Sequence, residues 1–414
     1  MKKILILSVT AGNAHNACAA GMKYKLEERG AEVKIIDVLK TYSSPINVWV
    51  ADGGYCFAAE WLRKTYNAFY EKYRRKDPLK RYSCAAHGVA LTTVSGLLKD
   101  ILDFKPDVIY CTHFYGAIAL TDLKLVYPLP CKTVVSNLDY VYSPFWEATV
   151  GIDAFAIPNE DFIEEAIEKG FKREQLLPVG LPVDGRTLEI LDQGEARKAL
   201  GLQDGVFTVM IMFGGGSFGE SYKIFKQVLK TLKCKPAQVI MINGKNEKSR
   251  KKIEKMKFPE GINVLNVGFT NEVPLYLSAA DLIINKCGGA SITEMVNKAC
   301  PMLINDKLIG QENHNLAYMK NKGVALSFKN GKQLKQKLLY LYDNPGVLQE
   351  MSEKCRPLKR NSVEDLADYI LSQPEADYSQ ILESDIDFKG VNKKVKAALK
   401  AADKTERNKK NGAY

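Results

Sequence analysis

Short runs of buried-type residues alternate with helical patterns along most of this chain, and this alternation constrains the fold more than any other feature. Five such runs lie in the first half, and six more follow after the pattern restarts. Hydrophobic strands that are separated by helices are typical of βαβ units and parallel sheets. The expected strands are Lys3–Val9, Glu32–Leu39, Asp107–His113, Thr133–Asp139, Ala154–Pro158, Phe207–Phe213, Gln238–Ile242, Asn263–Phe269, Asp281–Lys286, Pro301–Asn305 and Val324–Phe328.

The chain of 414 residues is longer than one hydrophobic core usually supports. We therefore expect an α/β protein with two facing Rossmann-like, doubly wound domains and a cleft between them. The expected domains are residues 1–182 and 206–373, joined by a linker over 183–205. The remaining segment, 374–414, is polar and rich in lysine, and it is predicted to order poorly.

The net charge of +11 is concentrated in two segments. Residues 63–81 carry a formal charge of +6 and residues 389–414 carry +7, so the rest of the chain is close to −2. Local positive charge suits an anionic membrane surface or a nucleic acid. Because no RNA-binding motif accompanies these segments, we expect a membrane surface and no nucleic-acid partner.

Cysteine usage and hydropathy bear on the compartment. The nine cysteines include no C-x-x-C pair, which fits a reducing cytoplasm. The apolar stretch at the N-terminus is only about six residues long, too short for a signal peptide. No stretch approaches the roughly 18 apolar residues of a membrane span. We expect a cytoplasmic protein, associated peripherally with the inner face of the cell membrane.

A glycine-rich loop, Gly214, Gly215, Gly216, Ser217, Phe218 and Gly219, follows the first strand of the second domain. It satisfies G-x-G-x-x-G in the strand-then-helix context of dinucleotide-binding folds. That motif expects a carboxylate at the end of the next strand, but the sequence there is Ile242-Asn243-Gly244-Lys245. The missing carboxylate weakens the dinucleotide interpretation, and a loop of this kind can equally bind any pyrophosphate through its backbone N–H groups.

Two further loops of the second domain each join a strand to a helix. In the first, Gly288 and Gly289 allow a tight turn, and Ser291 and Glu294 have the spacing of a capping box. Alternatively, Glu294 accepts the hydroxyls of a nucleotide ribose, although spacing alone favours the cap. The second loop, Gly310 to Asn315, gathers amide and carboxylate groups that suit either sugar hydroxyls or a hydrophilic helix cap.

Taken in order, these loops resemble the GT-B glycosyltransferases of the MGDG synthase and processive diacylglycerol glucosyltransferase family. Lys286-Cys-Gly-Gly-Ala-Ser-Ile-Thr-Glu294 and Gly310-Gln-Glu-Asn-His-Asn315 are similar to the family's K-P-G-G-x-T-x-x-E and P-G-Q-E-x-x-N motifs. Thr10-Ala-Gly-Asn-Ala-His15 resembles its G-x-G-H loop, and Asp139 to Trp146 resembles its T-D-x…H-x-x-W segment. The resemblance covers roughly residues 1–370 and is strongest over 264–325.

The resemblance implies an inverting transfer from a UDP-sugar to the hydroxyl of diacylglycerol, which is glycolipid synthesis. Carried over by position, Glu294 would hold the ribose, and the Gly268-Phe269 backbone would meet the uracil. The pyrophosphate would lie on Gly288 and Gly289, with Gly214 to Ser217 closing over the phosphates. The remaining donor contacts would be Ser291, Gln311, Glu312 and Asn315.

The resemblance also implies the catalytic groups of the N-terminal domain. His15 would be the general base or would orient it, since neutral imidazole is suited to accepting a proton near pH 7. Asp139 is the next candidate. We expect no metal and no other cofactor, because the D-x-D pattern Asp385-Ile-Asp387 lies near the lysine-rich tail, outside every predicted site.

Residues 45–82 combine many aromatic side chains with cations. The pattern is that of an amphipathic core helix with a solvated face, or of a segment at a membrane interface, where aromatics lie at headgroup depth. A lipid acceptor favours the interfacial interpretation. The residues predicted to meet the membrane or acceptor are Trp49, Trp61, Phe69, Tyr70, Arg74, Arg75 and Lys76.

Two other function classes remain open at this point. One is a GT-B transferase with another acceptor, such as a peptidoglycan-type lipid intermediate. The other is a non-catalytic protein that binds nucleotide sugars or a lipid surface. The sequence does not distinguish glucose, galactose or N-acetylglucosamine as the transferred sugar.

Overall fold

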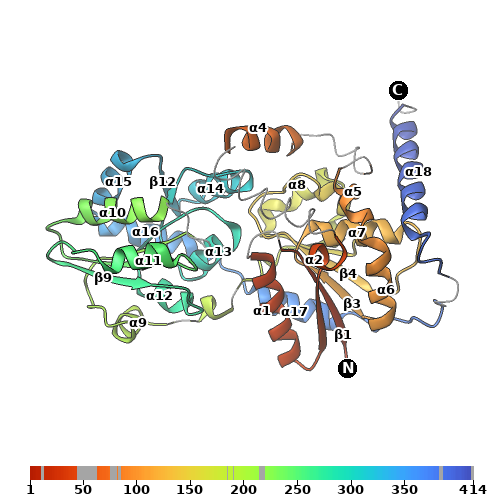
Figure 1. Ribbon diagram of the computed structural model, residues 1–414, viewed down its shortest axis with the longest axis horizontal. Coiled ribbons are helices and arrows are strands. Elements are labelled where there is room, and N and C mark those ends of the chain that lie inside the picture. Colours follow the sequence, from red (N-terminus) through yellow and green to blue (C-terminus); the bar gives the residue numbers. More distant parts are fainter. Residues whose placement is uncertain are drawn as a thin grey trace. The chain divides into compact units, whose positions relative to one another are not determined.

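The computed structural model describes residues 1–10, 14–43, 63–74, 82, 85–183, 185–189, 191–213, 220–381 and 386–411. The chain forms two compact units (Figure 1). The first unit is Met1–Asp184 together with Asn361–Tyr414, and the second is Gly185–Arg360. Each unit contains one six-stranded sheet flanked by helices.

The sheet of the first unit has the order β2-β1-β3-β4-β5-β6, and every pair of neighbouring strands is parallel. The strand order reverses between β1 and β3, which is the switch point of a doubly wound sheet. The strands are β1 (Lys3–Ser8), β2 (Glu32–Asp37), β3 (Val108–Cys111), β4 (Lys132–Ser136), β5 (Ala154–Ala156) and β6 (Leu176–Leu177). The helices are α1 (Ala14–Glu28), α2 (Val38–Tyr42), α4 (Arg63–Arg74), α5 (Ala85–Leu91), α6 (Val94–Phe104), α7 (Phe114–Lys124), α8 (Ile163–Glu168), α17 (Ser362–Ser372) and α18 (Val391–Asn411).

The sheet of the second unit has the order β12-β11-β10-β7-β8-β9 and is also parallel throughout. Its switch point lies between β7 and β10. The strands are β7 (Thr208–Met212), β8 (Ala237–Ile242), β9 (Ile262–Val267), β10 (Leu282–Asn285), β11 (Met302–Asn305) and β12 (Ala325–Phe328). The helices are α9 (Gln193–Ala199), α10 (Glu220–Leu232), α11 (Glu247–Glu254), α12 (Val273–Ala279), α13 (Gly289–Asn297), α14 (Gln311–Asn321), α15 (Gly331–Asp343) and α16 (Pro345–Cys355).

The eleven strands predicted from the sequence are confirmed, and the predicted α/β class with two doubly wound domains is confirmed with them. Alternate residues of each strand are buried against opposite faces. In β1, Ile4 and Ile6 belong to the core formed with α1 and α17. On the other face, a Cβ placed on Gly116 of α7 would lie 3.2 Å from Leu7. Burial on both faces explains why the strands are almost uniformly hydrophobic.

The end of the chain differs from the boundaries drawn from the sequence. Residues 361–373 were predicted to belong to the second domain, but α17 packs in the first unit. Its apolar side chains Val363, Leu366 and Ile370 are buried in the core that also contains Met22 and Leu26 of α1. Figure 1 shows α17 beside α1 of the first unit.

The segment predicted to order poorly contains the 21-residue helix α18. Val391, Val395 and Leu399 are 0%, 0% and 5% exposed, respectively. The helix contacts α5, α6 and α7. The prediction overlooked this stripe because three apolar residues at a spacing of four are inconspicuous among eight basic side chains. Among the described residues, no helix is both long and apolar enough to cross a membrane.

At the amino edge of each sheet, aspartate carboxylates accept backbone hydrogen bonds. An aspartate directly precedes β3, β5 and β10, and its carboxylate accepts the backbone N–H at the start of the neighbouring strand, which would otherwise lack a partner. The pairs are Asp107 with Lys3 at 2.8 Å, Asp153 with Thr133 at 2.7 Å, and Asp281 with Thr208 at 2.7 Å. The carboxyl edges therefore carry the loops that are available for function.

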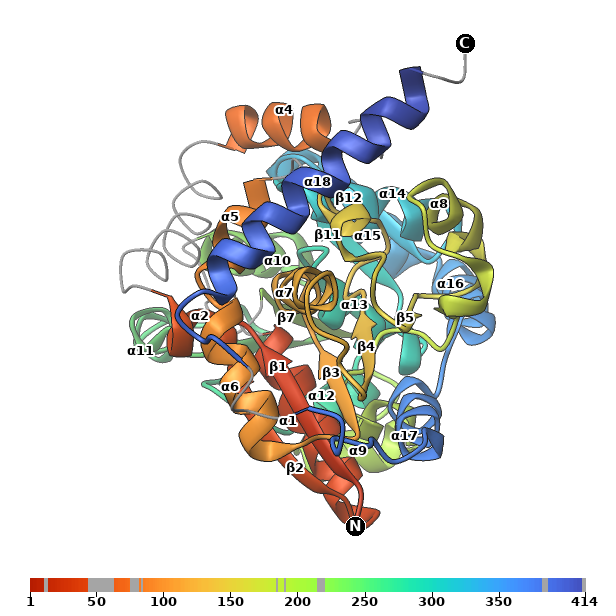
Figure 2. The same cartoon turned by 90° about the vertical axis from the view of Figure 1, so that its right-hand side faces the viewer.

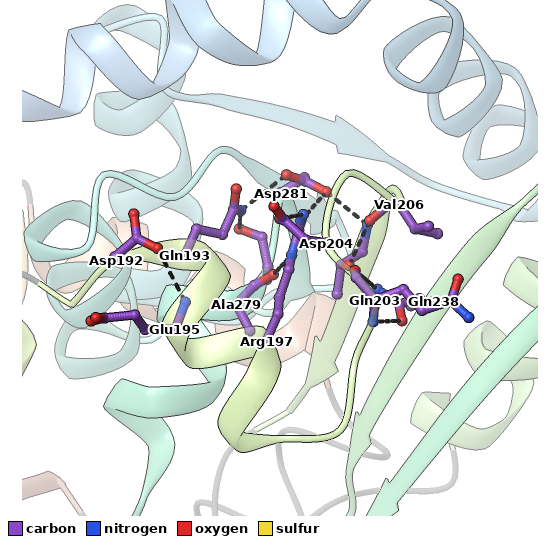
Figure 3. A network of polar contacts seen from close by, with 12 residues as sticks. Asp192, Gln193, Glu195, Arg197, Gln203, Asp204, Val206, Gln238, Ala279 and Asp281 are labelled. Atoms are coloured by element: carbon purple, nitrogen blue, oxygen red, sulfur yellow. Dashed lines mark hydrogen bonds and ion pairs between the residues drawn. The ribbon is translucent and has the colours of Figure 1, made fainter.

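Asp281 also holds a buried cation in the second unit (Figure 3). Arg197 of α9 is 3% exposed, and its Nη2 lies 2.8 Å from Asp281 Oδ2. Its Nε donates to the carbonyl of Ala279 at 3.1 Å, and Nη1 reaches Asp204 at 3.3 Å. The network attaches α9 to the amino edge of the sheet.

Removing Asp281 is expected to leave the Arg197 charge buried without its main counter-ion. Such a loss typically costs about 3–5 kcal/mol, so Asp281→Ala should lower the free energy of unfolding by about 3 kcal/mol in urea titrations. The matched control is Asp204→Ala, because the Asp204 side chain is 77% exposed while it contacts the same guanidinium. That control should cost less than about 1 kcal/mol. Equal effects of the two substitutions would contradict a buried network centred on Asp281.

Candidate functional site

The carboxyl edge of the second sheet carries most of the predicted donor-binding residues. In open α/β sheets, ligands bind at this edge near the switch point, which here lies between β7 and β10. The loop after β10 contains Gly288, and α13 begins at Gly289. The first N–H groups of α13 thus lie at the switch point, where they suit an anion. The loop after β7, Gly214 to Ser217, lies outside the described residues.

The start of α13 excludes the capping box at Ser291 and Glu294. The N-cap of this helix is Gly288, which places Ser291 within the first turn and Glu294 in the second. A capping box requires its serine at the N-cap itself. Glu294 is half-buried on α13. The alternative interpretation of Glu294 as a helix cap is therefore wrong.

The N-terminus of α14 packs against the loop between β10 and α13. Glu312 is 5% exposed, and its Oε1 lies 2.9 Å from Nζ of Lys286. A Cβ placed on Gly288 would lie 3.9 Å from the same carboxylate oxygen. Glu312 thus enters the site as one half of an ion pair, beside the predicted pyrophosphate position. Gln311, the first residue of α14, is half-buried.

Asn315 was predicted to contact the donor, but its position differs from that expectation. It is 0% exposed, and its Nδ2 donates to the carbonyl oxygen of Cys287 at 3.0 Å. Because this amide is fully buried, it stabilises the loop between β10 and α13 and is not exposed to a ligand. Asn315 and Lys286 together attach the loop to α14.

Gly268 and Phe269 follow β9, at the same carboxyl edge. The Phe269 ring is 59% exposed, and Nζ of Lys245 lies 5.8 Å from its centroid. Gly268 has little free space, because a Cβ there would lie 3.3 Å from Cδ of Arg250. These residues lie where backbone groups and an aromatic surface are available to a planar base.

The first unit brings two histidines together at its own switch point, between β1 and β3. His15 lies in the first turn of α1, and His113 is the N-cap of α7 directly after β3. Their rings contact edge to face, with centroids 4.6 Å apart. His113 was not among the predicted site residues. Its signal in the sequence is its place at the end of the strand that neighbours the first strand.

Hydrogen bonds define which nitrogen of each imidazole carries the proton. His15 Nδ1 lies 2.6 Å from the carbonyl oxygen of Thr112, which only accepts, so Nδ1 is the donor and Nε2 has the lone pair. His113 Nδ1 accepts the backbone N–H of Tyr115 at 3.1 Å, so its proton is on Nε2. Desolvation by burial lowers the pKa of His15 from 6.5 to about 4 and that of His113 well below 6.5. Near pH 7 both imidazoles are neutral. Nε2 of His15 is then a hydrogen-bond acceptor, and Nε2 of His113 is a donor.

Asp139 follows β4, which lies beside β3 in the sheet. The residue is half-buried, and its backbone N–H donates to Oδ1 of Asn137 at 3.2 Å. His15, His113 and Asp139 therefore follow three adjacent strands at one sheet edge. Among the described residues, no group of three or more His, Cys, Asp or Glu side chains has an arrangement that would hold a metal ion.

Of the residues predicted to meet the membrane or acceptor, the structure describes the side chains of Tyr70 and Arg74. Trp49, Trp61, Arg75 and Lys76 lie outside the described residues, as does the side chain of Phe69. Tyr70 is 5% exposed and stacks on Tyr66, so it packs as a core residue and does not face a headgroup. Nη1 of Arg74 lies 3.8 Å from Glu165 Oε1, which partly neutralises it within the protein.

Solved structures with a similar fold include glycosyltransferases and a putative UDP-N-acetylglucosamine 2-epimerase. The fold is similar to that of Acinetobacter baumannii MurG, with a TM-score of 0.59 at 15% identity over 90% of this chain and 99% of that one. It is also similar to the spinosyn rhamnosyltransferase SpnG complexed with thymidine diphosphate, with a TM-score of 0.55 at 12% identity over 88% and 100% of the two chains. These similarities show that the chain has the fold of the GT-B glycosyltransferases.

Family models identify the two halves of the chain. Residues 15–183 match monogalactosyldiacylglycerol (MGDG) synthase, and residues 210–370 match the C-terminal domain of glycosyltransferase family 28. Together the two matches cover most of the chain, which therefore combines an MGDG synthase domain with a C-terminal domain of glycosyltransferase family 28.

Relatives with similar sequences match most of the chain. A processive diacylglycerol beta-glucosyltransferase of Staphylococcus epidermidis is 25% identical over 92% of this chain and 96% of its own length. Monogalactosyldiacylglycerol synthase 2 of Arabidopsis thaliana is 26% identical over 80% of this chain and 72% of its own length.

Proposed function

We propose that the protein transfers a hexose from a UDP-sugar to the hydroxyl of diacylglycerol at a membrane surface, with inversion at the anomeric carbon. The observation that carries this proposal is the pair of family matches. Relatives with similar sequences are named as diacylglycerol glycosyltransferases. The structure adds a helix N-terminus suited to a diphosphate in one unit and a neutral imidazole suited to an alcohol in the other.

The donor would bind along the carboxyl edge of the second sheet. Gly288 and Gly289 offer the N-terminal N–H groups of α13 to the pyrophosphate, and Lys286 adds positive charge beside them. Glu294 would accept the ribose hydroxyls, and the backbone at Gly268 would meet the uracil. Gln311 would bind the sugar. The contact with Lys286 would hold the Glu312 carboxylate in place next to that sugar.

The acceptor would bind in the first unit, where His15 has the role of general base. The Thr112 carbonyl holds the imidazole in the tautomer whose Nε2 accepts a proton. That nitrogen takes the hydroxyl proton as the alcohol oxygen attacks the anomeric carbon and the UDP oxygen leaves. His113 would be a positioning residue that packs on His15 and keeps its ring in place.

Two further parts of the proposal concern the metal requirement of the reaction and the location of the protein. Charge on the leaving diphosphate would be stabilised by α13 and Lys286, so turnover should persist in EDTA. The protein would attach peripherally to the inner face of the cell membrane, with anionic lipid as its partner.

A transferase for another lipid acceptor is the second candidate, favoured by the structural similarity to MurG.

A substrate panel tests the proposal. Purified protein is given UDP-glucose, UDP-galactose or UDP-N-acetylglucosamine with diacylglycerol vesicles in EDTA, and lipids are analysed by mass spectrometry. We expect UDP release that depends on added diacylglycerol and a hexosyl-diacylglycerol product. Tight UDP binding without turnover would indicate a binding protein. Transfer only to an undecaprenyl-linked acceptor would establish the second candidate instead.

A further inference from the structure

Helix α18 is the last helix before the C-terminus (Figures 1 and 2). Its two faces differ in burial and charge. One face is packed, because Val391, Val395 and Leu399 are buried where the helix contacts α5, α6 and α7. Ala398, Ala402 and Glu406 are half-buried on the same side. This stripe runs at spacings of three and four residues, so it follows one side of the helix from its first turn to its fifth.

The opposite face carries a row of exposed cations. Its members follow one another at spacings of three, four, four and three residues, so they also form one stripe. They are Lys393, Lys396, Lys400, Lys404 and Arg407, all of which are exposed. At 3.6 residues per turn, this cationic stripe points about 140° away from the packed stripe.

The stripe remains cationic although acidic residues are present on the helix. Arg407 pairs with Asp403 at 2.9 Å, yet its side chain remains 68% exposed. The whole helix has eight basic and two acidic residues. Lys394 lies off the stripe, with its Nζ 5.9 Å from the centroid of the Tyr127 ring. The packed face therefore fixes the helix to the first unit and presents the row outward.

We infer that α18 is a preformed docking helix whose cationic stripe binds the anionic surface of a lipid bilayer. Charge complementarity supports this occupant, since a flat anionic surface matches a straight row of exposed cations. The stripe contains no aromatic residue on which nucleic-acid bases would stack. The inference rests on the proposed function in one respect: a diacylglycerol acceptor places the enzyme at a bilayer.

The test compares the complete chain with two variants, one with three substitutions and one with six. The first, Lys396→Gln, Lys400→Gln and Lys404→Gln, removes three charges from the stripe. The second exchanges neighbours, as Lys396→Ala with Ala397→Lys, Lys400→Ala with Ala401→Lys, and Lys404→Thr with Thr405→Lys. The exchange variant keeps composition and net charge but turns the three cations by about 100° around the helix. All six positions are exposed, so the melting temperatures should match that of the wild type.

Binding is measured by sedimentation with mixed vesicles of neutral lipid and about 30% anionic lipid, at low and at high salt. The glutamine variant should bind about 100-fold more weakly, and the exchange variant should also lose most of its affinity. Unchanged binding of the glutamine variant would overturn the inference. An exchange variant that binds like the wild type would overturn the role of the stripe. Tighter binding to single-stranded RNA than to vesicles would overturn the choice of a membrane.

Activity on diacylglycerol in detergent micelles separates this inference from the proposed function. The variants should keep wild-type turnover in micelles, where no anionic surface is needed. If the wild type itself has no micellar activity, the proposed function fails, while the vesicle comparison still decides the role of α18.

Discussion

Replacing His15 with alanine is expected to lower kcat by about 10²–10⁴-fold while the affinity for UDP stays nearly constant. The Thr112 carbonyl, 2.6 Å from Nδ1, leaves Nε2 as the proton acceptor. Without this imidazole, the attacking alcohol has no base to take its proton. Stopped assays with saturating diacylglycerol and calorimetric titration with UDP measure the two quantities separately.

The His15→Asn substitution is the matched control for polarity and reach. Asparagine retains a donor for the Thr112 carbonyl but does not accept a proton, so its turnover should fall as far as that of the alanine variant. Turnover within a few-fold of the wild type would make His15 a structural residue and would leave Asp139 as the next candidate base.

The pH profile gives a second measure of the same residue. Burial lowers the pKa of His15 to about 4, and a general base works in its deprotonated form. The value of kcat/KM should therefore stay level from pH 7 to about pH 5 and fall as the pH approaches 4. An acidic limb near pH 6.5 would indicate a different titrating group.

Replacing Glu294 with glutamine is expected to weaken UDP binding by about 10- to 100-fold, since hydrogen bonds to a charged group are worth about 1.5–3 kcal/mol. The substitution keeps the shape of the side chain and removes its charge. Helix α13 begins at Gly289, so Glu294 does not cap it, and the melting temperature should change little. Isothermal titration calorimetry provides the affinities.

A ligand without the ribose hydroxyls supplies the control for Glu294. The wild type and the Glu294→Gln variant should bind 2′,3′-dideoxyuridine diphosphate with similar affinity, because the proposed contact is absent from both complexes. An equal loss for UDP and for the dideoxy compound would place Glu294 away from the ribose. Unaltered UDP binding would make the assignment wrong.

Local patterns were sufficient for the strands and for the loops that follow them. A strand such as Val108–Cys111 is hydrophobic at every position because helices cover both faces of its sheet, and this property can be read from four consecutive residues. The glycines at 288 and 289 are similarly local, since a tight turn into α13 depends on the residues of the turn. The same holds for His15, whose place after the first strand already located it at a sheet edge.

Contacts between distant segments decided the rest. Lys286 meets Glu312 across 26 residues, and His15 meets the carbonyl of Thr112 across 97. Arg29, directly after α1, pairs with Glu364 of α17 across 335 residues. The residues of α17 have the apolar periodicity of a helix, but this pattern contains no information about which sheet the helix covers. The same limit applies to Tyr70 in its basic, aromatic segment, because burial depends on the partner that a face meets. The residue pattern of an element indicates whether each of its faces is buried or exposed. Which other element packs on a buried face depends on the packing of the whole chain.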